Sequence, residues 1–508
     1  MADLRITGVL AKLPDAPDAR PEPPGRIDID IEAGRIAAIR APGTPGPDAA
    51  EVIDGSTLFA VPGFINGHHH SHENFQKGRY ESLPLELWMN LVRPMKPIPV
   101  TAEQVYLRTM IGAIEALRTG TTTIVDDLNV SPVLDRTHVE AAMQAYEDIG
   151  IRAHVGMTLF DRPFFRGVPF VDETFPPDLL AELAAVEATP PAEVLAYAED
   201  LASRRHPAEN RVGFIAAPSA PQRCSDDFLR AVRALADRHA LPVIIHVQET
   251  RLQVVTAQRF YGRGMIEHLH ALDFLKPATS IIHGVWVSPR ELDLIAQSGA
   301  SVQHNPVSNL KLGSGLMPLR EMLRRGINVS LGTDGCGSIE SVDMLRVLAG
   351  TALLHKLHAD DFEEWVNSAE AFRAATQGGA RALGRDDLGR IAPGARADIA
   401  LYDTRSIAFT PLNNPVQQLT YAENGRALRH LFVEGRAVMR DGALTCIDEA
   451  AVIGRIHDAA AALEPAIAAA EATVGRIRAP YEAIYRRCCG EPIPQDIFAT
   501  KIPRPLRA

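Results

Sequence analysis

The sequence predicts an α/β protein: a (β/α)₈ barrel of the TIM type with a small β-sandwich domain assembled from both ends of the chain. Eight short apolar runs in the middle of the chain are each followed by a stretch with helical periodicity, a pattern typical of parallel strands that close into a barrel. Strand-like segments separated by turn residues stand before and after this region, which indicates a second, smaller unit.

Strand-like segments near both ends of the chain predict the small domain. They occupy residues 4–10, 26–31 and 35–39 near the start, and 398–402, 427–433 and 436–439 near the end. Each is a short run rich in apolar residues and bounded by residues that favour turns. We therefore expect residues 1–60 and 388–446 to build one β-sandwich domain together.

The apolar runs of the middle region supply the barrel strands. They are residues 59–65, 122–125, 152–157, 212–217, 242–246, 280–283, 301–304 and 328–331. Helical periodicity between successive runs is what a crossover between parallel strands requires. The barrel is therefore expected over residues 61–387.

Residues 447–508 are expected to form C-terminal helices and a tail. Residues 449–478 are rich in alanine and contain few residues that break helices, so they predict one or two helices. After Pro480 several prolines favour a tail that covers the surface or a neighbouring subunit.

Composition and charge narrow the class of protein. Hydrophobic residues make up 46% of the 508 residues and charged residues 23%, an ordinary balance for a globular protein. The formal net charge of -11 repels nucleic acid and acidic membrane surfaces, and no apolar run approaches the roughly 20 residues that span a bilayer. Five cysteines without a CxxC pair, and no secretory signal, favour a reduced, cytoplasmic protein.

Histidines cluster directly after the first apolar run, in the order His68, His69, His70, Ser71, His72. Because alternate residues of a strand point the same way, His68 with His70, or His70 with His72, could hold one metal ion. A histidine-rich surface loop is the alternative, but the position at the end of an apolar strand disfavours it. In a barrel of this type the carboxyl ends of the strands converge on the active site.

Polar residues also end three later runs. The fifth run ends at His246 with Glu249 three residues on, the sixth ends at His283, and the eighth leads to Asp334. Each alone has an ordinary explanation, such as a core histidine with a partner, an exposed loop carboxylate or a turn. Their joint occurrence at strand ends favours a single metal-binding site.

Three histidines and an aspartate suit Zn²⁺ and tolerate Fe²⁺ or Mn²⁺. Such a metal lowers the pKa of a bound water from about 15.7 towards 7, so that hydroxide is available at neutral pH. A carboxylate beside that water, such as Glu249, can pass its proton to a leaving group. The residues therefore predict a metal-dependent hydrolase.

The sequence resembles the amidohydrolase superfamily, in the cytosine deaminase-like branch that includes nucleoside deaminases and s-triazine hydrolases. The matching stretches are VPGFINGHHHSH from Val61, LRTGTTTIVDD from Leu117, LPVIIHVQET from Leu241, IIHGVWVS from Ile281, GASVQHNPVSNLKLGSG from Gly299, VSLGTDG from Val329, GRIAPGARADIALYD from Gly389 and HLFVEGRAVMRDG from His430. The resemblance extends from the N-terminal strands to about residue 445.

The resemblance implies a role for each strand-end residue. It gives the metal ligands as His68, His70, His246 and Asp334, and it leaves His69 and His72 outside the metal shell. It implies that Glu249 is the acid/base residue, that His283 polarises the substrate or orients the water, and that Asp334 can also take a proton from the water. Some members hold a second metal through a modified lysine; the fourth run has no lysine, so one divalent metal is expected.

The implied activity is that of an aminohydrolase acting on a C–N bond of a small nitrogen heterocycle or amidine. A cyclic amide hydrolase, or a hydrolase with another leaving group, is the alternative on the same scaffold. A non-catalytic scaffold protein is disfavoured because the full set of ligands and acid/base residues is present. The superfamily also implies a homo-oligomer, a dimer or larger, with a small-molecule substrate.

Four further residues are expected to contact the substrate. Ser219 stands where many nucleoside-deaminating relatives carry a histidine, which counts against a plain adenosine-type deaminase. Gln222 could then hydrogen-bond the substrate, and Trp88 and Phe75, in a segment resembling the family's lid, could stack on a planar ring. The simpler interpretation is that Gln222 is an exposed loop residue and that Trp88 and Phe75 are aromatic residues of the core.

Overall fold

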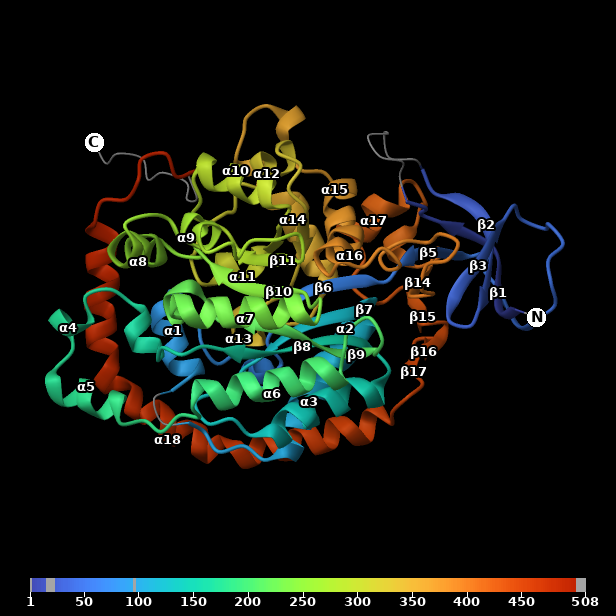
Figure 1. Ribbon diagram of the computed structural model, residues 1–508. Helices are drawn as coiled ribbons and strands as arrows, with labels where there is room; N and C mark the ends of the chain where they lie inside the picture. Colours follow the sequence, from blue (N-terminus) through green and yellow to red (C-terminus); the bar gives the residue numbers. More distant parts are fainter. Residues whose placement is uncertain (1, 15–22, 95–96, 499–508) are drawn as a thin grey trace.

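The computed structural model describes residues 2–14, 23–94 and 97–498 and confirms the predicted fold class. Eight parallel strands form the centre of the molecule, and a nine-stranded sheet stands beside it, on the right of Figure 1. The central strands, in order around the sheet, are β6 (Phe64–His69), β7 (Thr121–Leu128), β8 (Arg152–Leu159), β9 (Val212–Pro218), β10 (Val243–Val247), β11 (Thr279–His283), β12 (Ser301–His304) and β13 (Val329–Leu331).

Hydrogen bonds between the last and the first strand close the barrel. The Asp334 N–H, just after β13, donates to the His68 carbonyl at 2.9 Å. The Asn66 side chain accepts from the Thr333 N–H at 3.0 Å and donates to the Thr333 hydroxyl at 2.8 Å. The metal-ligand candidates of the first and eighth strands are therefore neighbours because the barrel closes there.

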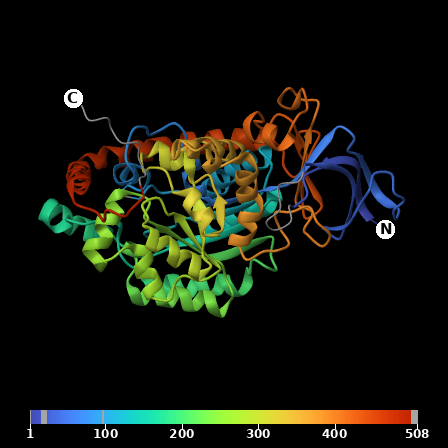
Figure 2. The same ribbon diagram turned by 90° about the horizontal axis from the view of Figure 1, so that it is seen from above.

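Helices surround the barrel (Figures 1 and 2). They are α1 (Leu85–Val92), α2 (Ala102–Arg118), α3 (Arg136–Ile149), α4 (Val171–Thr174), α5 (Pro177–Ala184), α6 (Pro191–Arg204), α7 (Asp226–Arg238), α8 (Arg251–Tyr261), α9 (Met265–Ala271), α10 (Pro289–Ser298), α11 (Pro306–Lys311), α12 (Leu319–Arg324), α13 (Cys336–Ile339), α14 (Met344–Leu354), α15 (Ser368–Arg373), α16 (Gly379–Ala382), α17 (Pro415–Tyr421) and α18 (Glu449–Gly490). Helix α10 begins with a capping box: Ser288 caps its first turn and Glu291 completes the box. None of the helices in the described part of the chain is long and apolar enough to cross a bilayer.

The second sheet joins strands from both ends of the chain. Its members are β1 (Ala2–Ala11), β2 (Gly25–Glu32), β3 (Arg35–Arg40), β4 (Ala49–Asp54), β5 (Leu58–Pro62), β14 (Ile399–Asp403), β15 (Leu428–Val433), β16 (Arg436–Arg440) and β17 (Ala443–Leu444). The two sets meet where β14 runs antiparallel to β5, with Leu401 opposite Ala60. Buried apolar side chains, including those of Ile6, Ile29 and Phe432, form its own core.

The first predicted barrel strand, residues 59–65, is wrong as a single element. Residues up to Pro62 belong to β5 of the second sheet, and the barrel strand begins at Phe64. At Gly63 the chain changes partners: the Gly63 N–H donates to the Asp398 carbonyl and the Phe64 N–H to the Gly120 carbonyl. Any larger side chain at Gly63 would collide with Thr122. Because every residue of both strands is buried, hydrophobicity alone did not reveal this break.

The C-terminal helix is longer than the sequence predicted. One helix, α18, covers 42 residues and continues through Pro465 and Pro480 to Gly490. Prolines inside a helix remove a hydrogen bond and bend it, and Figure 1 shows α18 (red) changing direction along the barrel. Around Pro480 its buried side chains pack on α8 and on residues 164–183, which offsets the cost of the proline. The part of the expected tail at 499–508 lies outside the described residues.

A buried arginine connects the barrel to the second sheet. Arg152, at the start of β8, is 1% exposed. Its guanidinium pairs with Asp398 at 3.2 Å and with Glu434 at 3.0 Å, on the connections beside β14 and β15. Removing the guanidinium would leave the Asp398 carboxylate buried without its partner, which costs more than losing a surface pair.

We expect Arg152→Met to lower the free energy of unfolding by about 3–5 kcal/mol, the range for breaking a buried ion pair. The control is Arg478→Met, which removes an exposed pair with Glu482 on α18 and should cost at most ~0.5 kcal/mol. Urea unfolding followed by circular dichroism measures both variants. Equal losses of unfolding free energy in the two variants would show that the Arg152 pairs stabilise the protein no more than a surface pair does.

Candidate metal centre

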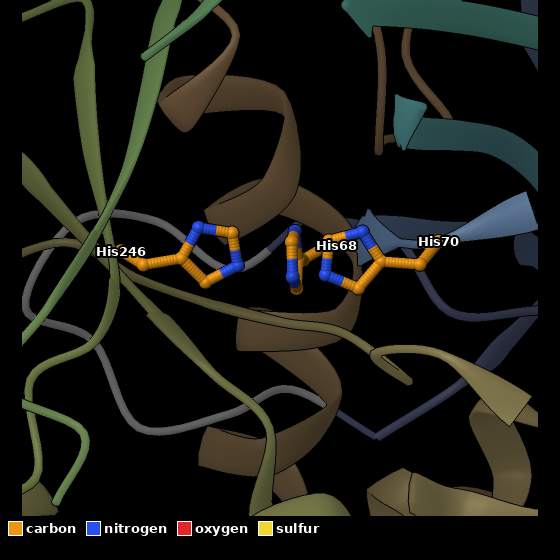
Figure 3. Close-up of side chains that lie close together, drawn as sticks. All are labelled: His68, His70 and His246. Carbon is orange, nitrogen blue, oxygen red and sulfur yellow. The ribbon is translucent and has the colours of Figure 1, made fainter. Parts of the chain in front are cut away.

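The strand ends bring four ligand candidates together: His68, His70, His246 and Asp334. Figure 3 shows the His68 ring between the rings of His70 and His246. Candidate ligand atoms of these three histidines lie within 4.8 Å of one another, as do those of His68, His283 and Asp334. The Asp334 Oδ1 atom is 3.6 Å from His68 Nε2 and 3.5 Å from His70 Nε2. The two sets share His68, so they form one cluster.

Backbone carbonyls orient two of the histidine rings. His70 Nδ1 lies 2.8 Å from the Asp127 carbonyl, and His246 Nδ1 lies 2.9 Å from the Ser219 carbonyl. Because a carbonyl only accepts, each Nδ1 carries the proton and each Nε2 keeps its lone pair. Burial holds the pKa of both rings well below the usual value, which favours this neutral form.

His68 is the clearest indication that the cluster binds a cation. It is fully buried, and neither of its ring nitrogens has a hydrogen-bond partner among the described residues. A buried polar ring without a partner is costly unless something else satisfies it. Two ligands of a Zn²⁺ ion, each about 2.0–2.1 Å from it, are at most about 4.2 Å apart. The distances from Asp334 to His68 and His70 fall within that limit, so these residues fit a divalent cation.

Asp334 is held as a carboxylate by its neighbours. Its Oδ1 accepts from the Gly335 N–H and its Oδ2 from the Ser308 hydroxyl, both at 2.8 Å. Burial acts to raise its pKa, but His68, His283 and His70 outweigh burial and hold the pKa well below the usual value. Its backbone is left-handed, with φ of 66°, a conformation that is uncommon outside glycine and recurs at functional sites.

Glu249 and His283 lie beside this cluster. Glu249 is 3% exposed, and its Oε2 is 3.5 Å from His283 Nε2, which is 3.8 Å from Asp334 Oδ2. The Ser314 hydroxyl donates to the Glu249 Oε1 at 3.2 Å, and His283 Nδ1 lies 2.9 Å from the Asn309 Oδ1. Burial, with the charges of Asp334 and Glu86, raises the pKa of Glu249 well above its usual value, while burial lowers that of His283 to about 4.

Two more carboxyl groups sit close by. Glu73 is almost fully buried, and burial together with the Asp334 charge raises its pKa to about 8. Burial raises the pKa of Asp127 to about 6, and its carboxylate is 3.8 Å from His246 Nδ1. Several buried carboxyl groups around neutral histidines make the site attractive to a cation.

The four residues predicted to contact the substrate lie in different surroundings in the structure. Ser219 reaches the cluster through its carbonyl, which accepts from the His246 ring, and Gln222 is buried with its Oε1 without a hydrogen-bond partner among described residues. Trp88 is buried against Leu85, Val92 and Leu312, and its indole donates to the Gly337 carbonyl. Phe75 is half-buried on the main core. Trp88 and Phe75 therefore pack as core residues in this structure, and Ser219 makes a hydrogen bond to the cluster.

Several residues that support the site were not identified from the sequence. Ser308, Asn309 and Ser314, on α11 and the loop after it, contact Asp334, His283 and Glu249. They lie within the stretch GASVQHNPVSNLKLGSG, but a run of polar residues after a strand does not show which side chains turn inward. His72, the alternative partner of His70, instead contacts Arg93 and the Asn129 N–H.

Comparison with known proteins places the chain in a family. The model of the amidohydrolase family matches residues 59–438. The chain is 32% identical to a 5'-deoxyadenosine deaminase of Methanothermobacter thermautotrophicus over 86% of this chain and 95% of that protein. It is 34% identical to a 5-methylthioadenosine/S-adenosylhomocysteine deaminase of Thermococcus sibiricus over 82% of this chain and 90% of that protein.

Solved structures show the same fold. An adenosine deaminase of Xanthomonas campestris with bound zinc superposes with a TM-score of 0.79 at 27% identity, covering 91% of this chain and 99% of that one. An atrazine chlorohydrolase of Arthrobacter aurescens complexed with zinc, at 22% identity, superposes with a TM-score of 0.81 over 90% of this chain and 100% of that one. The chain therefore belongs to the amidohydrolase family and is a metal-dependent hydrolase of carbon–nitrogen bonds other than peptide bonds.

Proposed function

We propose that this protein is a zinc-dependent deaminase of adenosine-type nucleosides that carry a modified sugar, and that it replaces the amino group of the purine ring by oxygen. The buried cluster of His68, His70, His246 and Asp334 beside Glu249 carries this proposal. The relatives named for 5'-deoxyadenosine and 5-methylthioadenosine support the choice of substrate. Ser219, which counts against plain adenosine, is compatible with a modified sugar.

The proposed ligands of a single ion are His68, His70, His246 and Asp334. Three nitrogen donors and one oxygen donor suit Zn²⁺, and solved relatives in this fold hold zinc. Held by these residues, a zinc ion would supply a water of lowered pKa, so that hydroxide would be available near pH 7. The protein contributes ring orientation through the Asp127 and Ser219 carbonyls, and a site from which bulk water is largely excluded.

Protons move through the two carboxyl groups in the proposed reaction. Water supplies the oxygen that bonds to the ring carbon, and the carbon–nitrogen bond breaks to release ammonia. Asp334, which is held as a carboxylate, accepts a proton from the water. Glu249, whose protonated form is favoured by burial, donates a proton to the amino nitrogen that leaves. His283 lies between them and is placed to orient the water or the substrate.

We expect His68→Asn to reduce the metal content of the purified protein, because the ring nitrogens of His68 have no hydrogen-bond partner among the described residues and are free to bind the ion. The loss of metal affinity should exceed the ~10–100-fold typical of losing an outer partner of a ligand. Elemental analysis after dialysis against a weak chelator measures it. The matched control is His72→Asn, on the same segment, which should keep its metal. Full metal occupancy in His68→Asn would contradict the proposed ligand set.

We expect Glu249→Gln to lower kcat by roughly 10²–10⁴-fold, because the amide cannot pass a proton to the nitrogen. Its metal content and thermal unfolding should match those of the parent protein, since Glu249 is not among the proposed ligands. Ammonia release is measured with 5'-deoxyadenosine, 5'-methylthioadenosine and adenosine as substrates. If the fully metal-loaded parent protein released no ammonia from any adenosine derivative, deamination would be rejected in favour of another C–N substrate.

A further inference from the structure

A small cavity lies beside Glu249 and is closed by the C-terminal helix. Its volume is about 110 Å³. Its walls come from the start of α1, the start of α8, the residues after β11 and α11, and the end of α18. They include Glu86, Thr250, Trp286, Ser314, Cys488 and Cys489. It is therefore built from five parts of the chain that are distant in sequence.

The cavity borders the proposed acid/base residue directly. Ser314 lines the cavity, and its hydroxyl donates to the Glu249 carboxylate. Thr250, the residue after Glu249, also lines it, and its hydroxyl donates to the buried Glu86 carboxylate. A group in the cavity would therefore lie against one residue that is hydrogen-bonded to Glu249 and another that follows it in the chain.

The end of α18 is fixed against the same part of the barrel. The guanidinium of Arg251, two residues after Glu249, donates to the Cys488 carbonyl at 3.2 Å and to the Glu491 carbonyl at 2.7 Å. An arginine at the last carbonyls of a helix satisfies groups that the helix leaves open and is favoured by its dipole. Figure 1 shows this end of α18 (red, left) beside α8.

The residues that follow α18 continue this attachment. The Phe498 N–H donates to the Val287 carbonyl at 3.1 Å, and Ile493 and Ile497 pack against Trp286, another wall residue. The match to the family ends at residue 438, before α18 begins at Glu449. The C-terminal wall therefore comes from a part of the chain that the family model does not cover.

We propose that this cavity, the α18 subsite, receives the 5'-substituent of the nucleoside, and that the C-terminal helix thereby selects the substrate. The proposal rests on the function proposed above and narrows its substrate class. The family's barrel supplies the chemistry, and the wall from α18 supplies the choice of substituent.

Size and chemistry define what the α18 subsite accepts. Its volume is smaller than the ~150 Å³ of an engineered cavity that binds benzene, so it suits a group of a few non-hydrogen atoms rather than a long side chain. Trp286, Leu312 and Cys488 give it apolar walls, which favour a methyl or methylthio group. We expect compact 5'-groups to be accepted and the long amino-acid chain of S-adenosylhomocysteine to be disfavoured.

The decisive variant is Cys488→Phe, which fills the subsite from α18. We expect it to lower kcat/KM for 5'-methylthioadenosine by ~10–200-fold, the range for a mismatch in an apolar pocket. For 5'-deoxyadenosine the loss should be at least several-fold smaller, because its 5'-methyl group needs less room. The exposed Cys446→Phe is the matched control and should change neither value.

A second measurement avoids reliance on activity or on the folding of Cys488→Phe. Cys489 lines the subsite and is exposed, as is Cys446, which lies elsewhere. In the parent protein, 5'-methylthioinosine, the product of deamination, should slow alkylation of Cys489 and leave Cys446 unaffected. Two results together would overturn the proposed α18 subsite. They are equal alkylation of Cys489 with and without this product, and an unchanged preference of Cys488→Phe between 5'-methylthioadenosine and 5'-deoxyadenosine. If ammonia release persisted in that case, the deaminase assignment would stand and only the subsite would fail.

Discussion

Buried acidic groups around neutral histidines are the constraint on which the rest of this structure depends. Asp334, Glu249, Glu73 and Asp127 all lie out of contact with bulk water at one end of the barrel. Burial raises the pKa values of the last three, and the charge of Asp334 adds to this effect for Glu249 and Glu73. A divalent cation bound there would offset the cost of burying these acids and would give the ring of His68 a partner.

The barrel supplies the geometry that this constraint needs. Residues from β6, β10, β11 and β13 converge only because these strands are parallel and in register, with Val247 opposite His283. The ends of the strands turn sharply: Gln248, His283 and Asp334 all have positive φ. Such conformations cost of order 1–3 kcal/mol each, so the hydrogen bonds of Asn66, Asn309 and Ser308 have to offset them.

The strand-end histidines and acids could be predicted because their signal is local. An apolar run that ends in a histidine indicates both the strand and the direction of the ring, so the amino-acid sequence alone is enough to place His246 and His283. The residues that orient them could not be predicted, because Asn309 and Ser314 lie on a helix and a loop whose facing is decided by packing. The surroundings of Trp88 could not be predicted for the same reason. It lies in a segment that resembles the family's lid, but whether its ring contacts substrate or packs in the core depends on neighbours such as Leu312.

The second sheet has a consequence for how the protein is made. Its strand β5 pairs with β14, and the ribosome releases β14 only after the whole barrel has been synthesised. Until then the edge of β5 presents unpaired backbone groups, which is the situation that promotes aggregation of nascent chains. The N-terminal strands therefore wait for the C-terminal ones, and the sheet closes only after β14 has emerged and Asp398 can reach Arg152.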